Sequence, residues 1–114
     1  RYDAEFPQNV HRLALESVQL TLVSTASPVG EVSNFVTDHV IALRAFENRV
    51  FVACANHCGD DGRFDFAGRS HIAAPDGASL AKAAEGEALR ITDIAPNHYD
   101  LSRIENPRLS DFRL

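Results

Sequence analysis

The run from Val50 to Ala55 is apolar at every position, which is the feature that most constrains the fold. Six apolar residues of this kind predict a strand whose two faces are both buried. Such a strand lies in the middle of a sheet, and a layer of packed structure covers each face of that sheet. The fold therefore has to place this segment in the middle of a sheet and pack other structure on both faces of that sheet.

Helical and extended patterns alternate before and within this region. Pro7 suits a first helical turn, because its missing amide hydrogen costs nothing there, and we expect a helix from about Pro7 to Ser17. The β-branched run from Val18 to Thr25 predicts a buried strand. Ser33 is the expected N-cap of a long helix that ends at Asn48 and leads into the central strand.

The second half of the chain is richer in turn signals. We expect residues 56–63 to form a polar loop that contains glycine. Beyond the loop, the pattern predicts several further elements: short extended pieces at 64–66, 70–74 and 78–83, a strand at 88–94 and a helix at 99–105.

This order of elements predicts an α/β fold with a mixed sheet and helices on one face. A chain of 114 residues has enough side chains for one core, so we expect one domain over residues 1–114. Few helices remain to cover the second apolar face of the sheet. Something else should cover that face.

Charge and composition exclude several classes of partner. The net charge is −5, and acidic and basic residues are interleaved, so a nucleic acid is not expected as a partner. No apolar stretch approaches the roughly 20 residues that span a bilayer. The two cysteines, Cys54 and Cys58, are too few for a disulfide framework. We expect a cytoplasmic protein that binds no membrane.

Four stretches resemble the carbon–nitrogen hydrolase, or nitrilase, superfamily in its amidase branch. Each is weak alone, but their order and spacing together are specific. They read RYDAEFPQ at residues 1–8, RAFEN at 44–48, ANHCG at 55–59 and FAGRSHIAAPDG at 66–77, and the ending at 106–113 is also similar. The resemblance covers this chain but only the carboxy-terminal half of the family's domain. It implies half of an α-β-β-α sandwich.

The resemblance also implies a chemistry that this chain lacks. In that family a glutamate base, a lysine and a cysteine nucleophile hydrolyse nitriles or amides through a thioester. The nucleophile precedes the Tyr-Asp pair, a position held here by Arg1, whose guanidinium is not nucleophilic. The glutamate and lysine would lie upstream of Arg1, and Lys82 is not expected to replace the lysine. We expect an inactive fragment of an amide or carbamoyl-amide hydrolase that needs no cofactor.

Several residues are candidates for the pocket of a complete enzyme. By resemblance, Tyr2 and Asp3 belong to the nucleophile turn, with the Tyr2 amide as the oxyanion donor; alternatively they only begin a helix. The loop at Ser24, Thr25 and Ala26 would line the pocket, although small polar residues are also ordinary loop formers.

Other polar residues are expected to be structural. They are Arg44, Glu47 and Asn48, which could cluster at a helix end, and Asn56 and Ser70, of which Ser70 can satisfy loop amides.

Two alternative sites involve the cysteines. A zinc site could draw on six residues: Cys54, His57, Cys58, Asp60, Asp61 and His71. The Cys54–Cys58 spacing, however, is not that of structural zinc, and we expect no metal. A nucleophilic pair of Cys58 with a histidine would need an orienting group and an oxyanion hole that the sequence does not locate.

The last alternative is an interaction module without catalysis. Members of the family pair through the helix after the nucleophile and through the helix that carries the Arg-Ala-x-Glu-Asn motif. We therefore expect a homo-oligomer formed by the helices at 7–17 and 33–48. If the parent enzyme is intact, the other expected partner is a small amide substrate.

Overall fold

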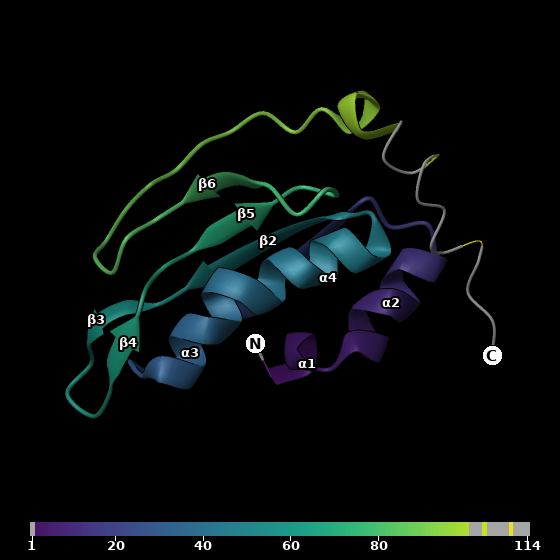
Figure 1. Ribbon diagram of the computed structural model, residues 1–114. Helices are drawn as coiled ribbons and strands as arrows, with labels where there is room; N and C mark the ends of the chain where they lie inside the picture. The colour runs from purple at the N-terminus through teal and green to yellow at the C-terminus, as the bar shows by residue number, and fades with distance from the viewer. Residues whose placement is uncertain (1, 101–103, 105–109, 111–114) are drawn as a thin grey trace.

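The computed structural model describes residues 2–100, 104 and 110. Four strands form one mixed sheet, and two short strands form a separate hairpin. The helices lie together on one face of the larger sheet (Figure 1). The predicted fold class, a mixed sheet with helices on one face, is confirmed.

The central strand is β2, Phe51–Asn56, which has a neighbour on each side. It pairs in parallel with β1, Leu20–Thr25, and antiparallel with β5, His71–Ala73. The outer strand β6, Ser79–Lys82, continues the sheet beyond β5. The apolar run that predicted a central strand therefore occupies that place.

Two helical segments pack on the sheet. One comprises α1, Tyr2–Glu5, and α2, Pro7–Leu15; the other comprises α3, Glu31–Phe35, and α4, Ile41–Asn48. They enclose a core between helices and sheet, made of Ala4, Val10, Ala14, Ile41, Ala45, Val50, Val52, Cys54 and Ala73. Within the described part of the chain, no helix has the length and apolar character needed to cross a bilayer.

A π-helical turn, η1 at Val36–Val40, joins α3 to α4. The wider turn changes which side chains face the sheet, so that Val36 and Ile41, five positions apart, are both buried. The prediction that Ser33 caps this helix is wrong. The helix begins at Glu31 after Gly30, and Ser33 is buried inside α3.

The predicted loop at 56–63 is wrong in part. Cys58–Asp60 form β3, which pairs antiparallel with β4, Asp65–Ala67. The sequence did not predict this hairpin, because its strands carry polar side chains and lack an apolar pattern. The two strands pair through their backbone groups. Its turn is closed by Asp61, whose carboxylate accepts hydrogen bonds from the amides of Arg63 and Phe64.

The segment 88–94 was predicted to be a strand and forms none in the structure. It runs past β6 without pairing, and Leu89 and Ile91 are 82% and 83% exposed (Figure 1). A 3₁₀ turn follows, η2 at Pro96–Tyr99. Tyr99 ends that turn and packs edge-on against Phe51. Most of the helix predicted at 99–105 lies outside the described residues.

Candidate functional site

A hollow of about 290 Å³ lies where α1 and α2 meet β1. It brings together Asp3 from α1 and Ser24 from the carboxyl end of β1, two residues that the sequence placed in one pocket. Tyr2 begins α1, so its backbone amide stands at the start of this short helix. Arg1 lies outside the described residues. Thr25 and Ala26 follow Ser24 but do not line the hollow.

Two polar residues of this hollow were missed by the sequence analysis. Asn9 donates a hydrogen bond from Nδ2 to the carbonyl oxygen of Asp3 at 2.9 Å, which ties α2 to α1. Thr21 is 7% exposed, and its Oγ1 has no hydrogen-bond partner among the described residues. A buried hydroxyl without a partner costs free energy, so Thr21 is an unusual residue for the wall of this hollow. An alternating strand pattern alone does not distinguish such a threonine from an ordinary core residue.

Arg44 holds α1 in place from the opposite helical segment. Its Nε donates to the carbonyl oxygen of Ala4 at 2.9 Å, and its Nη2 donates to the carbonyl oxygen of Glu5 at 2.7 Å. Nη1 forms an ion pair with Glu47 at 3.0 Å. A planar guanidinium can make all three bonds at once, so this side chain fixes the end of the helix that forms the hollow.

Asn48 links α4 to α2. Its Nδ2 donates to the carbonyl oxygen of Arg44, and its Oδ1 lies 3.0 Å from Nδ1 of His11. Arg44, Glu47 and Asn48 thus form one cluster at the carboxyl end of α4.

Asn56, the last residue of β2, connects two loops, the one after β1 and the one between β4 and β5. Its Oδ1 accepts from the amide of Ser27 at 2.8 Å, its Nδ2 donates to the carbonyl oxygen of Gly68 at 2.9 Å, and its own amide donates to Oγ of Ser70. Thr25 joins this network through the hydroxyl of Ser27 at 3.0 Å. The loop after β1 is therefore held by the Asn56 side chain, which also binds the segment before β5.

The residues of the two cysteine alternatives do not converge on one point, although Cys54 of β2 is paired with His71 of β5. Cys54 is buried on β2, Cys58 is half-buried on β3, and the His57 ring packs against Phe66 with centroids 5.3 Å apart. Among the described residues, no three His, Cys, Asp or Glu side chains lie close enough together to hold a metal ion. The Asp60 and Asp61 carboxylates both accept hydrogen bonds from amides of their own turn.

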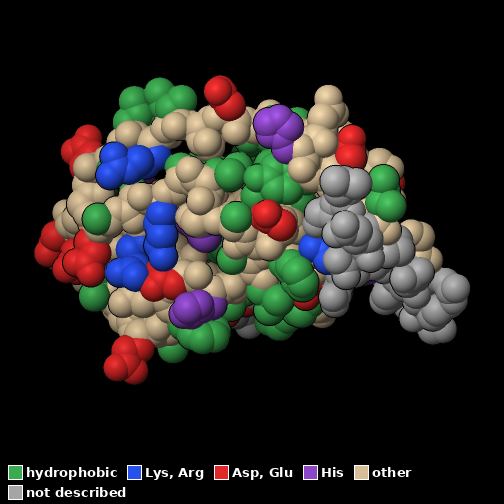
Figure 2. Space-filling model, turned by 45° about the horizontal axis from the view of Figure 1, so that its top comes forward, with side chains coloured by type: hydrophobic (Ala, Val, Ile, Leu, Met, Phe, Trp, Pro, Cys, Tyr) green, Lys and Arg blue, Asp and Glu red, His purple; other side chains and the backbone are tan. Residues whose placement is uncertain are grey.

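An ion-pair cluster that the sequence did not suggest joins η1 to β6 and to Arg69, in the segment between β4 and β5. Asp38 accepts hydrogen bonds from Nε and Nη2 of Arg69, and its Oδ1 lies 2.7 Å from Nζ of Lys82. Burial raises the pKa of Asp38, but the hydrogen bonds and charges of the two cations outweigh it and lower the pKa overall. Figure 2 shows basic side chains beside acidic ones on one face of the molecule, without an extended basic patch.

His71 lies beneath this cluster. Its Nδ1 is 3.2 Å from the carbonyl oxygen of Thr37, and burial lowers its pKa. The neutral imidazole is therefore favoured at this position.

The carbon–nitrogen hydrolase family model matches residues 2–103. The chain belongs to that family. It is 46% identical, over 98% of its length, to a hydrolase encoded in the pqqF 5′ region of Pseudomonas protegens, of which it covers 39%. It is 28% identical to the 2-oxoglutaramate amidase of Bacillus subtilis and covers 42% of that protein.

A solved amidase has the same fold. The amidase of Nesterenkonia sp. AN1, from the nitrilase superfamily, matches 98% of this family member with 34% identity and a TM-score of 0.84, while the match covers 38% of the amidase. One structure of that amidase carries an acetamide moiety on its active-site cysteine, and another holds butyramide. The chain thus spans about two fifths of the length of these relatives and is part of a nitrilase-superfamily hydrolase domain.

Proposed function

We propose that this chain is the carboxy-terminal portion of an amidase that cleaves the carbon–nitrogen bond of a small amide. The observation that carries the proposal is the hollow that brings together Asp3 and Ser24. The hollow adjoins the start of α1, directly after the position at which the family resemblance places the nucleophile. The amidases among the relatives support the choice of an amide over a nitrile.

The chemistry would proceed through an acyl-enzyme. A cysteine thiolate attacks the amide carbonyl carbon, and the tetrahedral intermediate expels ammonia after the base transfers a proton to the nitrogen. Water then hydrolyses the thioester to a carboxylic acid. The backbone amide of Tyr2 would stabilise the oxyanion in this sequence of steps. The base, the lysine and the cysteine are not supplied by this chain, so we expect no turnover from it alone.

A graft tests this proposal. Residues 1–114 would replace the matching 39% of the Pseudomonas hydrolase, which is 46% identical to them. Three versions would be compared: one with Arg1 retained, one with Arg1→Cys and one with Arg1→Ala. We expect the Arg1→Cys graft alone to release ammonia from butyramide, because it alone carries a nucleophile.

Two measurements make the outcome decisive. Circular dichroism and size-exclusion chromatography establish that the three grafts fold alike, and mass spectrometry after fluoroacetamide treatment reports the acetamide adduct on the introduced cysteine. A folded Arg1→Cys graft that forms neither adduct nor ammonia contradicts the amidase proposal. Turnover with Arg1 retained contradicts the assignment of position 1.

The second candidate is a homo-oligomer formed through the helices. Large apolar side chains on them are exposed, between 36% and 59%: Leu13 and Leu15 on α2, Phe35 on α3, and Leu43 and Phe46 on α4. Exposed apolar side chains on these helices favour association with a second copy.

Sedimentation tests this candidate. We expect concentration-dependent dimers that Leu43→Asp abolishes and that Leu22→Asp, on the opposite face of the sheet, leaves intact. A monomer at every concentration would argue against the interaction role.

A further inference from the structure

The π-helical turn η1 contains a backbone hydrogen bond that is one residue longer than that of an α-helix. The amide of Ile41 donates to the carbonyl oxygen of Val36, five positions back. In an α-helix the same amide would donate to Thr37, four positions back. The wider turn therefore removes that bond from the carbonyl oxygen of Thr37.

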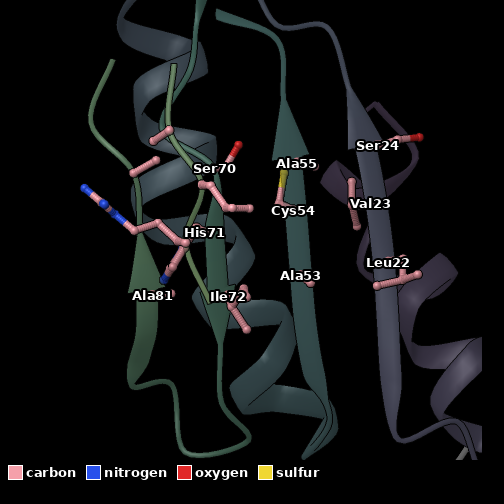
Figure 3. Close-up of a pocket in the computed structure, with 14 residues that line it drawn as sticks. Leu22, Val23, Ser24, Ala53, Cys54, Ala55, Ser70, His71, Ile72 and Ala81 are labelled. Atoms are coloured by element: carbon pink, nitrogen blue, oxygen red, sulfur yellow. The ribbon is translucent and has the colours of Figure 1, made fainter. Parts of the chain in front are cut away.

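The sheet binds two successive residues of this turn. Nδ1 of His71 lies 3.2 Å from the carbonyl oxygen of Thr37, and Nζ of Lys82 lies 2.7 Å from Oδ1 of Asp38. His71 and Lys82 lie opposite each other in register on β5 and β6. Figure 3 shows His71 and Cys54 on neighbouring strands, with helices behind the sheet. A donor from the sheet thus binds the carbonyl oxygen that the wider turn releases.

The His71 ring is suited to this single bond. It is 3% exposed, and its Nε2 has no hydrogen-bond partner among the described residues. A carbonyl oxygen only accepts, so Nδ1 carries the hydrogen of the neutral imidazole. The bond to Thr37 is therefore the polar contact that orients the ring.

The wider turn sets the direction in which α4 faces. Four buried residues follow one another at a spacing of four: Ser33, Thr37, Ile41 and Ala45. This spacing drifts by about 40° per step around an α-helix, and a π-helical turn, which holds more residues, reduces the drift. Without the wider turn, α4 would be rotated by about 100°, the angle of one residue. Arg44 would then no longer point toward α1.

We propose that His71 is a positioning residue for the amide cleavage, because it holds η1 in the π-helical form that directs Arg44 toward α1. Arg44 donates to the carbonyl oxygens of Ala4 and Glu5. The same helix begins at Tyr2, whose backbone amide is the proposed oxyanion donor. The effect on catalysis rests on the proposed function, whereas the effect on the helix does not.

Two variants separate the hydrogen bond from the bulk of the side chain. His71→Asn keeps an N–H donor near the place of Nδ1, whereas His71→Leu has no donor. NMR scalar couplings across hydrogen bonds, measured on the 114-residue chain, report which carbonyl group the Ile41 amide binds. We expect Val36 in the native chain and in His71→Asn. In His71→Leu we expect Thr37 instead, together with loss of the coupling from Arg44 to α1. A His71→Leu chain that keeps both native couplings overturns the proposal.

A deletion supplies the matched control. His39 is an exposed residue of η1, and a chain without it can form a regular α-helix that leaves the faces of α4 unchanged. In this background we expect His71→Leu to fold and to keep the coupling from Arg44 to α1, because a regular helix needs no bond from β5. Loss of folding or of that coupling in the double variant overturns the proposal, also where His71→Leu alone does not fold.

Ammonia release from the Arg1→Cys graft into the Pseudomonas hydrolase tests the effect on catalysis. We expect His71→Leu to lower kcat for butyramide by about 10-fold or more with little change in KM, since an oxyanion donor acts on the transition state. His71→Asn should recover most of the loss. An unchanged kcat in His71→Leu, or equal losses in the two variants, overturns the positioning role. A graft that releases no ammonia with His71 in place refutes the proposed function and leaves the helix result standing.

Discussion

Arg44 of α4 and Ala4 of α1 are joined by a buried hydrogen bond of 2.9 Å across 40 positions of sequence. The same guanidinium bonds the carbonyl oxygen of Glu5 and pairs with Glu47. A four-residue helix has too few internal hydrogen bonds to hold itself. The position of α1, and with it one wall of the hollow, therefore depends on a side chain from a distant helix.

Replacing Arg44 tests this dependence. We expect Arg44→Ala to lower the free energy of unfolding by about 3 kcal/mol, because it leaves buried carbonyl oxygens and a half-buried carboxylate without a partner. Arg44→Lys should recover only part of the loss, since one ammonium cannot follow the fork of the guanidinium. Urea unfolding measures both. Equal stability of Arg44→Lys and the native chain would show that the fork geometry of the guanidinium adds nothing.

Gly68 is expected to tolerate no side chain. Its φ is +65°, and an added Cβ would lie 2.9 Å from the carbonyl carbon of Glu85 and closer still to the oxygen. Gly68→Ala should cost about 2 kcal/mol or more, from backbone strain and from the clash together. Gly62 has a φ of +92° and open space around it, so Gly62→Ala, which carries the strain alone, is the matched control. Similar melting temperatures of the two variants would contradict the clash.

The sequence predicts the elements that depend on local pattern. The apolar run of β2 and the helix that ends at Asn48 are both present, because each pattern describes contacts made within one face of one element. The π-helical turn is different. It changes which side chains of the helix face the sheet after Val36, and no residue type in the sequence predicts it.

Other features depend on partners that a pattern cannot specify. Residues 88–94 have the period of a strand, but a strand also requires a neighbour to bond with. Strands β3 and β4 pair with each other, although neither has the alternating apolar pattern that predicts a strand. The motif at 44–48 indicated a structural role for Arg44. Its hydrogen bonds to Ala4 and Glu5 could not be predicted, because they follow from the packing of α4 against α1. The Asp38 cluster likewise joins residues 31 and 44 positions apart.

Stability should fall as the pH falls below about 6.5 because of His71. Burial lowers the pKa of this side chain below its ordinary value of 6.5, so the unfolded state binds the proton first. The contribution of neutral His71 to the free energy of unfolding is complete above pH 6.5. It is lost between that pH and the lower pKa of the folded state. His71→Gln should flatten the dependence of the unfolding free energy on pH below 6.5. An unchanged slope in His71→Gln would exclude this assignment.

Asp38 should control a separate and more acidic window. Its pKa is lowered from 3.8, so its contribution is present above pH 3.8 and is lost as the pH falls through the pKa of the folded state. We expect Asp38→Asn to destabilise the chain by about 1 kcal/mol at pH 7 and to flatten the acid limb of the profile. Double-mutant cycles with Arg69→Met and Lys82→Met measure the two couplings. The coupling to Arg69 should be larger, because Arg69 makes two hydrogen bonds and is 23% exposed, whereas Lys82 is 39% exposed. If the Lys82 coupling is equal or larger, the cluster is held by charge alone and the bidentate geometry adds nothing.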